Sequence, residues 1–123
     1  MDAELILIDG SNVRRSGWPN ATAAELVTAV AAWRSKRAPQ ALVIVVFDGS
    51  PTELDTDADP VRVVTVPYAD AVLADIARDA VEEGSCVRAA TSDRELRERL
   101  VAAGAVVAWG GGALFRELGL GRG

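Results

Sequence analysis

The chain of 123 residues contains no histidine. Without histidine it cannot use Ser-His-Asp or Cys-His catalysis, and it cannot form any zinc site that needs a histidine ligand. Its single cysteine, Cys86, leaves no disulfide framework, and the position of Cys86 in an apolar run predicts a small buried hydrophobic side chain.

Positive charge is also scarce, because 13 basic residues face 18 acidic ones and leave a net charge of −5. Wholesale electrostatic binding to nucleic acid is therefore not expected, and such a partner needs a local basic patch or bridging metal ions. No cationic leader or long apolar run opens the sequence, so we expect a cytoplasmic protein with no membrane contact. Homo-oligomerisation stays open. The length predicts one compact domain over residues 1–118 and a fraying glycine-rich end at 119–123.

Short aliphatic runs alternate with stretches of helical periodicity. Strands are predicted at 5–8, 41–47, 61–66, 86–90 and 105–109, and helices at 22–36, 68–83, 92–103 and 113–118. Capping boxes at Thr22–Glu25 and Ser92–Glu95 mark two of the helix starts, and residues 14–20 are predicted to form an exposed loop. This alternation predicts an α/β protein, a three-layer α/β/α sandwich around a mainly parallel sheet of about five strands.

Three of the predicted strands each deliver an aspartate to what we expect to be one end of the sheet. Asp9 follows the first strand, Asp48 the second and Asp93 the fourth. Ligands of open α/β sheets bind in the crevice beyond the carboxyl ends of the strands. The three carboxylates are therefore predicted to share one crevice.

Helical spacing adds a fourth aspartate. In the 68–83 helix, Asp70 falls at the edge of the apolar arc and in the first turn, whereas Asp75 and Asp79 fall on the solvent side. The predicted cluster is Asp9, Asp48, Asp70 and Asp93, with Asn12, Thr91 and Ser92 as polar neighbours.

Each aspartate by itself also has a structural interpretation, as a turn residue or as a carboxylate favoured by about 0.3–1 kcal/mol at a helix N-terminus. Four converging carboxylates, however, repel one another, and their pKa values rise unless a cation neutralises them. Mg²⁺ or Mn²⁺ is the natural partner, since it retains waters that a phosphate can displace. Such a site suits phosphodiester hydrolysis, which needs no histidine when a metal lowers the pKa of a bound water.

Two other motifs are rejected as ligand sites. The acids of residues 55–59 superficially resemble a calcium loop, but Pro60 and Val66 stand where a glycine and a bidentate glutamate are required. Gly110, Gly111 and Gly112 are not followed by the Lys-Ser/Thr pair of a phosphate loop, so a flexible turn is expected there.

Several basic residues flank the predicted crevice. Arg14 and Arg15 are candidates either to hold substrate phosphates or simply to be solvated at the surface. Arg94 is a third candidate, although we favour for it a surface pair with Glu98. Trp18 in the same loop is a candidate either to stack on a base or to cap the adjacent helix.

These residues resemble the PIN-like nuclease superfamily and, within it, the NYN domain of the small bacterial YacP-type group. The resemblance spans nearly the whole chain and is carried by the order and spacing of Asp9–Val13, Val46–Gly49, Ala69–Asp70 and Thr91–Arg94, with a closing strand and short helix after Gly104.

The resemblance implies a metal-dependent endoribonuclease with Mg²⁺ or Mn²⁺ as cofactor and RNA as partner, on the ribosome in some members. Its acidic metal positions match Asp9, Asp48, Asp70 and Asp93, and Asn12 matches the polar residue beside the first; Asn12, Arg14, Arg15, Ser92 and Arg94 are the predicted substrate contacts. Ala71 departs from the family, which usually has a second acid there, so one metal rather than two, or weak metal binding, is expected.

The main alternative is a catalytically weak or inactive RNA- or ribosome-binding module of the same fold, which Ala71 and the acidic net charge favour. A toxin of the PIN type stays open. Receiver-like and haloacid-dehalogenase-like domains are poorly supported, because Asp9-Gly10-Ser11 lacks the adjacent or alternating acids that those domains carry after the first strand.

Overall fold

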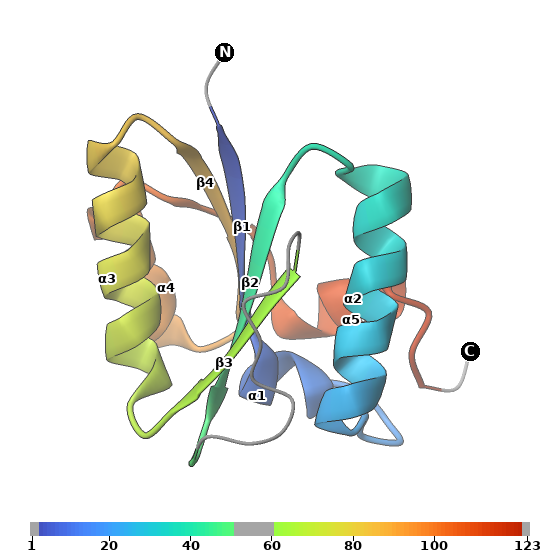
Figure 1. Ribbon diagram of the computed structural model, residues 1–123. Helices are drawn as coiled ribbons and strands as arrows, with labels where there is room; N and C mark the ends of the chain where they lie inside the picture. The colour runs from blue at the N-terminus through green and yellow to red at the C-terminus, as the bar shows by residue number, and fades with distance from the viewer. Residues whose placement is uncertain (1–2, 51–60, 122–123) are drawn as a thin grey trace.

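The computed structural model describes residues 3–50 and 61–121. Its strands are β1 (Glu4–Asp9), β2 (Leu42–Asp48), β3 (Val61–Val66), β4 (Cys86–Ala90) and β5 (Val106–Trp109), and its helices are α1 (Gly10–Arg14), α2 (Ala23–Arg37), α3 (Ala69–Glu82), α4 (Arg94–Ala102) and α5 (Gly111–Glu117). The strands form one parallel sheet in the order β3-β2-β1-β4-β5 (Figure 1). The predicted α/β fold with a five-stranded sheet is confirmed.

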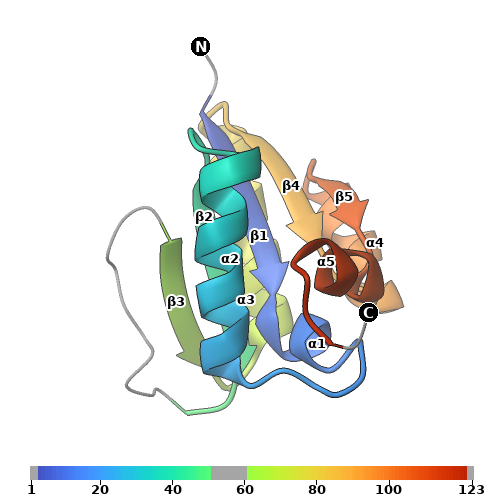
Figure 2. The ribbon, with the colours of Figure 1, turned by 90° about the vertical axis from the view of Figure 1, so that its right-hand side faces the viewer.

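The central strand β1 is covered on both faces, which explains its run of aliphatic residues. Ile6 and Ile8 pack on one side against a core that α2 and α5 complete, whereas Leu5 and Leu7 pack on the other side with α3 and α4. Figures 1 and 2 show α2 and α5 on one face of the sheet and α3 and α4 on the other. The sheet is therefore the middle of three layers.

The connection order places a topological switch point between β1 and β4. From β1 the chain builds β2 and β3 toward one edge, and it then returns to place β4 and β5 on the other side of β1. The crevice beyond the carboxyl ends of such a pair of strands is where open α/β sheets bind ligands. Asp9 ends β1 and Thr91 follows β4, so both lie at this point.

The helix starts agree with the sequence in one case and differ in two. The capping box of α2 is present, with Thr22 Oγ1 accepting from the Glu25 amide at 3.1 Å and Glu25 Oε1 accepting from the Thr22 amide at 2.9 Å. At α4 the predicted Ser92 box is wrong, because Asp93 is the N-cap. The helix α1 was not predicted, and it makes Arg14 its last residue instead of the start of a loop.

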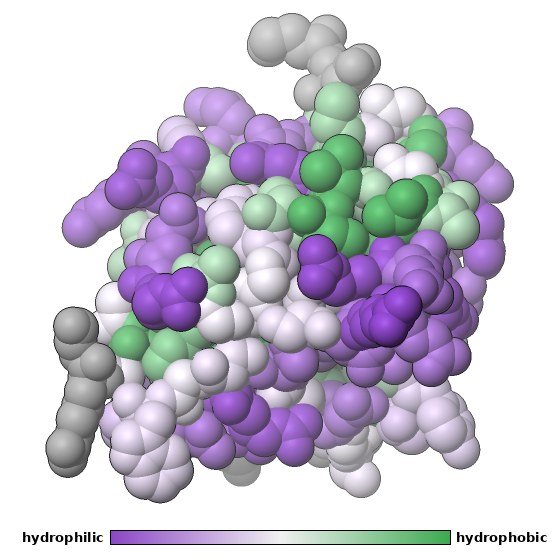
Figure 3. All heavy atoms as spheres, turned by 180° about the vertical axis from the view of Figure 1, so that it is seen from behind, coloured by the Kyte–Doolittle hydropathy of each residue, from purple (hydrophilic) through white to green (hydrophobic). Residues whose placement is uncertain are grey.

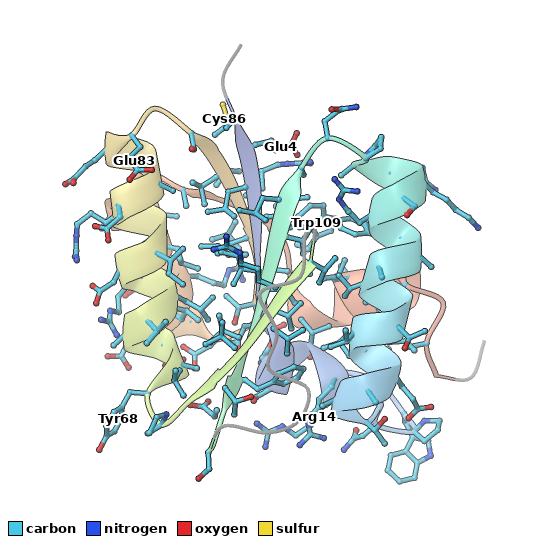
Figure 4. The ribbon with its side chains drawn as sticks, in the orientation of Figure 1. Glu4, Arg14, Tyr68, Glu83, Cys86 and Trp109 are labelled. Carbon is cyan, nitrogen blue, oxygen red and sulfur yellow. The ribbon has the colours of Figure 1, made fainter. Side chains whose placement is uncertain are left out.

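Two further expectations are wrong for reasons of position. Cys86 is exposed, because it begins β4 at the rim of the sheet, beside Glu4 and opposite the rim at which Arg14 lies (Figure 4). The Gly110–Gly112 segment is not a loose turn, because Gly110 caps α5 and Gly111 is a buried residue of its first turn.

Some expectations concern residues that the structure does not describe. The acids of 55–59, rejected as a calcium loop, and the last two residues of the predicted fraying end lie outside the described residues. Within that predicted end, Leu120 packs against the core that α2 and α5 cover. None of the helices within residues 3–50 and 61–121 is long and apolar enough to cross a membrane.

Replacing Gly10 with alanine should destabilise the fold. A Cβ at Gly10 would lie 2.6 Å from Phe47 Cε1 and 2.9 Å from Val45 Cγ1, two side chains of the buried strand β2. Overpacking of such a position typically costs about 1–3 kcal/mol of unfolding free energy. Urea unfolding of Gly10→Ala and wild type measures this cost.

Gly112→Ala is the matched control, since both glycines lie in the first turn of a helix. The Cβ of Gly112 would come no closer than 3.7 Å to the Ser16 carbonyl oxygen, and alanine is the better helix former. Equal stabilities of the two variants would contradict the close packing of Gly10.

Candidate active site

A polar cavity of about 290 Å³ lies at the switch point. It is lined by the four predicted aspartates, Asp9, Asp48, Asp70 and Asp93, and by Ser11, Asn12, Arg15 and Ser16. The aspartates come from four separate segments, the ends of β1 and β2, the first turn of α3 and the residue before α4. The structure thus brings together residues that are up to 84 positions apart in the sequence.

Asp9 is the buried member of this group, with 5% of its surface exposed. Its carboxylate accepts hydrogen bonds from Thr91 Oγ1 at 2.8 Å and from the Asn12 amide at 3.4 Å. Burial raises the pKa of Asp9 to about 6; the two hydrogen bonds act against this rise, while the charges of Asp70 and Asp48 add to it. Ionisation of Asp9 therefore costs free energy in the folded protein, and a nearby positive charge would offset that cost.

Asp48 and Asp93 each accept a hydrogen bond from an amide in the first turn of a helix, as well as lining the cavity. Asp48 Oδ1 accepts from the Ala69 amide at the start of α3 at 3.1 Å, and Asp93 Oδ1 accepts from the Leu96 amide in α4 at 2.8 Å. Asp9 likewise caps α1. The structural interpretation thus holds for three of the aspartates. At Asp48 and Asp93 it does not compete with ligand binding, because a carboxylate has two oxygens and the bond to the helix amide uses one.

Asp70 has no such capping bond and is the aspartate that the structural interpretation explains least. It lies half-buried in the first turn of α3. Partial burial, followed by the charges of Asp93 and Asp48, raises its pKa. Asp75 and Asp79 are exposed, and Asp75 pairs with Arg78 at 2.7 Å, which confirms that these two acids face away from the cavity.

Asn12 and Ser92, predicted as substrate contacts, hold the walls of the cavity together. Asn12 Oδ1 accepts from the Ser92 amide at 2.8 Å, and Ser92 Oγ accepts from the Gly111 amide at 2.7 Å. These bonds join α1, the β4–α4 turn and the start of α5. A Cβ at Gly111 would lie 2.4 Å from Asn12 Oδ1, so the glycine is required by this close approach.

Two further hydroxyls position the site, that of Thr91, which the sequence predicted as a polar neighbour of the cluster, and that of Ser11, which it did not. Ser11 Oγ accepts from the Asp48 amide at 2.9 Å and so joins the ends of β1 and β2. Thr91 is fully buried, and its Oγ1 accepts from the Asp93 amide at 3.1 Å while donating to Asp9. Small polar residues directly beside a predicted catalytic aspartate were the available signal.

The three arginines that were predicted to contact the substrate lie at three different cavities. Arg15 lines the acidic cavity, and its Nε donates to the Ser11 carbonyl at 2.8 Å. Arg14 lines a neighbouring cavity of about 450 Å³ that shares Ser11 and Asp48 with the first, and it donates to the Ala21 carbonyl at 3.4 Å. Figure 4 shows Arg14 at the same end of the sheet as Tyr68, which precedes α3.

Arg94 lies away from the acidic cavity. Its Nε is 3.8 Å from Glu98 Oε1, which confirms the favoured surface pair, and both side chains are highly exposed. Arg94 instead borders a larger and mostly apolar cavity of about 780 Å³ between α4 and β5, beside Val101 and Val106. Figure 3 shows apolar side chains at the surface of this face. This cavity lacks converging carboxylates and is not the candidate active site.

The donor set of the acidic cavity fits a hydrated hard cation better than a closed metal cage. Within residues 3–50 and 61–121, no three Asp, Glu or Cys side chains converge as tightly as a ready-made metal site requires. The cavity is nevertheless lined by carboxylate, amide and hydroxyl oxygens, and Mg²⁺ keeps several waters and needs only one or two carboxylates directly. Burial is the first cause of the raised pKa values of Asp9 and Asp70, and the neighbouring carboxylates raise both further, a repulsion that a cation would relieve.

Comparison with known proteins agrees with the fold. No family model and no curated protein matches the chain. Among solved structures it is similar to the crystal structure of a mutant of Rae1 (YacP) from Bacillus subtilis, with 23% sequence identity and a TM-score of 0.66. The match covers 94% of this chain and 75% of that chain. The chain therefore has a YacP-like fold.

The raised pKa of Asp9 predicts that the metal-free protein loses stability as the pH rises. The unfolded chain releases this proton near pH 3.8, whereas the folded chain holds it until about pH 6. Between these values the folded state binds more protons, so the free energy of unfolding decreases with rising pH. The decrease is at most about 3 kcal/mol and is complete above the folded pKa.

Urea unfolding with a chelator, across this range of pH, measures the decrease. Asp9→Asn should lose most of it, because the variant cannot ionise there, while the exposed Asp75→Asn should keep it. An unchanged pH dependence in Asp9→Asn would show that burial of Asp9 does not control the titration.

Proposed function

We propose that the chain is a cytoplasmic endoribonuclease that uses Mg²⁺ or Mn²⁺ to hydrolyse RNA phosphodiester bonds in the acidic cavity. The observation that carries this proposal is the meeting of four aspartates from separate segments in one polar cavity at the switch point of the sheet. The YacP-like fold and the resemblance of the motifs to PIN-like nucleases support it.

The chain's own residues have distinct parts in this proposal. Asp70, with no capping bond, and the second oxygens of Asp48 and Asp93 would hold the cation directly or through water. A bound cation would lower the pKa of Asp9, which burial and like charge raise, and would so stabilise its ionised form. When bound, the metal supplies a water of lowered pKa and offsets charge on the phosphate.

Arginines would hold the RNA against an otherwise acidic protein. Arg15 reaches the acidic cavity and Arg14 the cavity next to it, so the two flank the carboxylates on the side of α1. Phosphate contacts of this kind position a strand without reading its sequence. The resemblance suggests RNA on the ribosome as a partner, and presentation by the ribosome would offset the weak attraction of free RNA to a chain of net charge −5.

A non-catalytic RNA-binding module is the second candidate. Capping by Asp9, Asp48 and Asp93 gives these residues a structural purpose, and Ala71 stands where a further acid is usual in the family that the motifs resemble. Asp70 separates the two candidates because it caps nothing. A binding module has no use for a carboxylate whose pKa is raised by partial burial and by two neighbouring acids.

Asp70→Asn should therefore keep the fold and lose the metal. Removing a repelled carboxylate leaves the melting temperature unchanged or raises it, whereas loss of a ligand should weaken Mn²⁺ binding by at least about tenfold. Calorimetric titration of Mn²⁺ measures the affinity. Cleavage of single-stranded and structured RNA, with Mg²⁺ or Mn²⁺, measures whether activity falls in parallel.

Asp75→Asn is the control, because it removes an exposed carboxylate from the same helix. A wild-type protein that binds RNA but binds no Mn²⁺ at millimolar concentration would favour the binding module. Equal Mn²⁺ affinities of wild type and Asp70→Asn would remove Asp70 from the proposed site.

A further inference from the structure

Trp18 is the exposed tryptophan of the chain, with 78% of its side chain accessible. The other two, Trp33 and Trp109, pack edge to face with their ring centroids 5.4 Å apart in the interior between the sheet and α2. The alternative that Trp18 caps the adjacent helix is not supported, because most of the surface of Trp18 is exposed to solvent. A single exposed apolar residue carries no argument by itself. Its backbone and its neighbours do.

The segment that carries Trp18 is held firmly. The Ser16 amide donates to the Val13 carbonyl at 3.0 Å, and the Ala21 amide donates to the Arg14 carbonyl at 2.8 Å, so both ends of the segment are closed. Gly17 presses on α5 so closely that a Cβ there would lie 2.1 Å from Phe115 Cε1. The backbone is thereby fixed, and the indole is presented to solvent.

A small cavity beside Trp18 shares a lining residue with the candidate active site. It has a volume of about 210 Å³, is mostly polar, and is lined by Trp18, Ser16, Gly112 and Arg116 among others. Ser16 also lines the acidic cavity, where its Oγ donates to the Asn12 carbonyl at 2.6 Å. The two cavities therefore share Ser16 as a lining residue.

We propose that Trp18 and Arg116 form a subsite that stacks one unpaired base of RNA beside the point of cleavage. This inference rests on the proposed function and gives it a substrate class, single-stranded RNA. An indole face stacks on any base, and a guanidinium at the same cavity holds the adjoining phosphate. A base within a duplex is already stacked on its neighbours, so the subsite favours unpaired RNA.

The charges around the subsite agree with a nucleotide as its occupant. Arg15 lines the acidic cavity and Arg116 lines the cavity of Trp18, so each of the two cavities that Ser16 lines is also lined by an arginine. Two arginines here interrupt a surface of net negative charge. Guanidinium groups and an exposed indole are the groups that bind the phosphates and stack the bases of a single strand.

The first experiment compares wild type with Trp18→Ala and Trp18→Phe on short single-stranded oligo-RNA in the presence of Mn²⁺. Base–aromatic stacking implies that Trp18→Ala raises KM about 5- to 150-fold with little change in kcat, and that Trp18→Phe keeps most of the wild-type affinity. The melting temperature of Trp18→Ala should not move, because the side chain is exposed. Val101→Ala, an exposed apolar residue on α4, is the control and should match wild type.

The second experiment locates the base. We would prepare a series of substrates, each with one abasic nucleotide at a different position from the cleavage point. At one position, loss of the base should weaken binding to wild type but should not weaken binding to Trp18→Ala any further. Fluorescence gives a readout that needs no activity: with Ca²⁺ in place of Mn²⁺, single-stranded oligo-RNA should quench wild-type emission more than that of Trp18→Phe.

The outcomes distinguish this inference from the proposed function. Suppose that wild type cleaves RNA, that Trp18→Ala has the same KM, and that the effects of the variant and of the abasic nucleotide are additive at every position. This result would overturn the subsite and leave the proposed nuclease function intact. Binding without cleavage, with the expected dependence on Trp18, would support the subsite in an RNA-binding module. A wild type that neither binds nor cleaves RNA would overturn both.

Discussion

The hydrogen bond from Thr91 Oγ1 to Asp9 holds the two strands of the switch point together at their carboxyl ends. Both residues are buried, so the bond gives a carboxylate oxygen in the protein interior a hydrogen-bond partner in place of water. The same hydroxyl accepts from the Asp93 amide, and Asp9 also receives the Asn12 amide. The first turns of α1 and α4 are therefore both held by hydrogen bonds that lead to one buried carboxylate.

Repulsion among the aspartates is the cost of this arrangement, and helix N-termini offset part of it. Asp9, Asp48 and Asp93 each accept from an amide at the start of a helix. Aligned peptide dipoles make such positions favourable for negative charge. Asp70 is in the first turn of α3 as well, yet its pKa and that of Asp9 stay raised. The folded protein thus keeps an unneutralised excess of negative charge at a single point, which is the physical basis for expecting a cation there.

Helix capping also pre-organises the carboxylates for the ligand binding that we propose. A carboxylate fixed by a helix amide has lost its rotational freedom before any ligand arrives, and a site built on helices and strands is positioned better than one on loops. The Asn12–Ser92–Gly111 chain of hydrogen bonds extends this rigidity to α5. Through Gly17 and Phe115 it reaches the segment that presents Trp18. One packed unit therefore carries both the acidic cavity and the aromatic surface beside it.

The sequence by itself determined the strands, most of the helices, the end of the sheet that the acids share, and the outward direction of Asp75. These follow from local periodicity and from the rule that parallel strands end at one edge. Tertiary structure alone decided that Asp93 rather than Ser92 caps α4, that a helix starts at Gly10, and that Arg94 faces another surface. Those outcomes depend on contacts between segments distant in the chain. Thr91 takes a buried carboxylate 82 positions away as its partner, and no local pattern encodes such a choice.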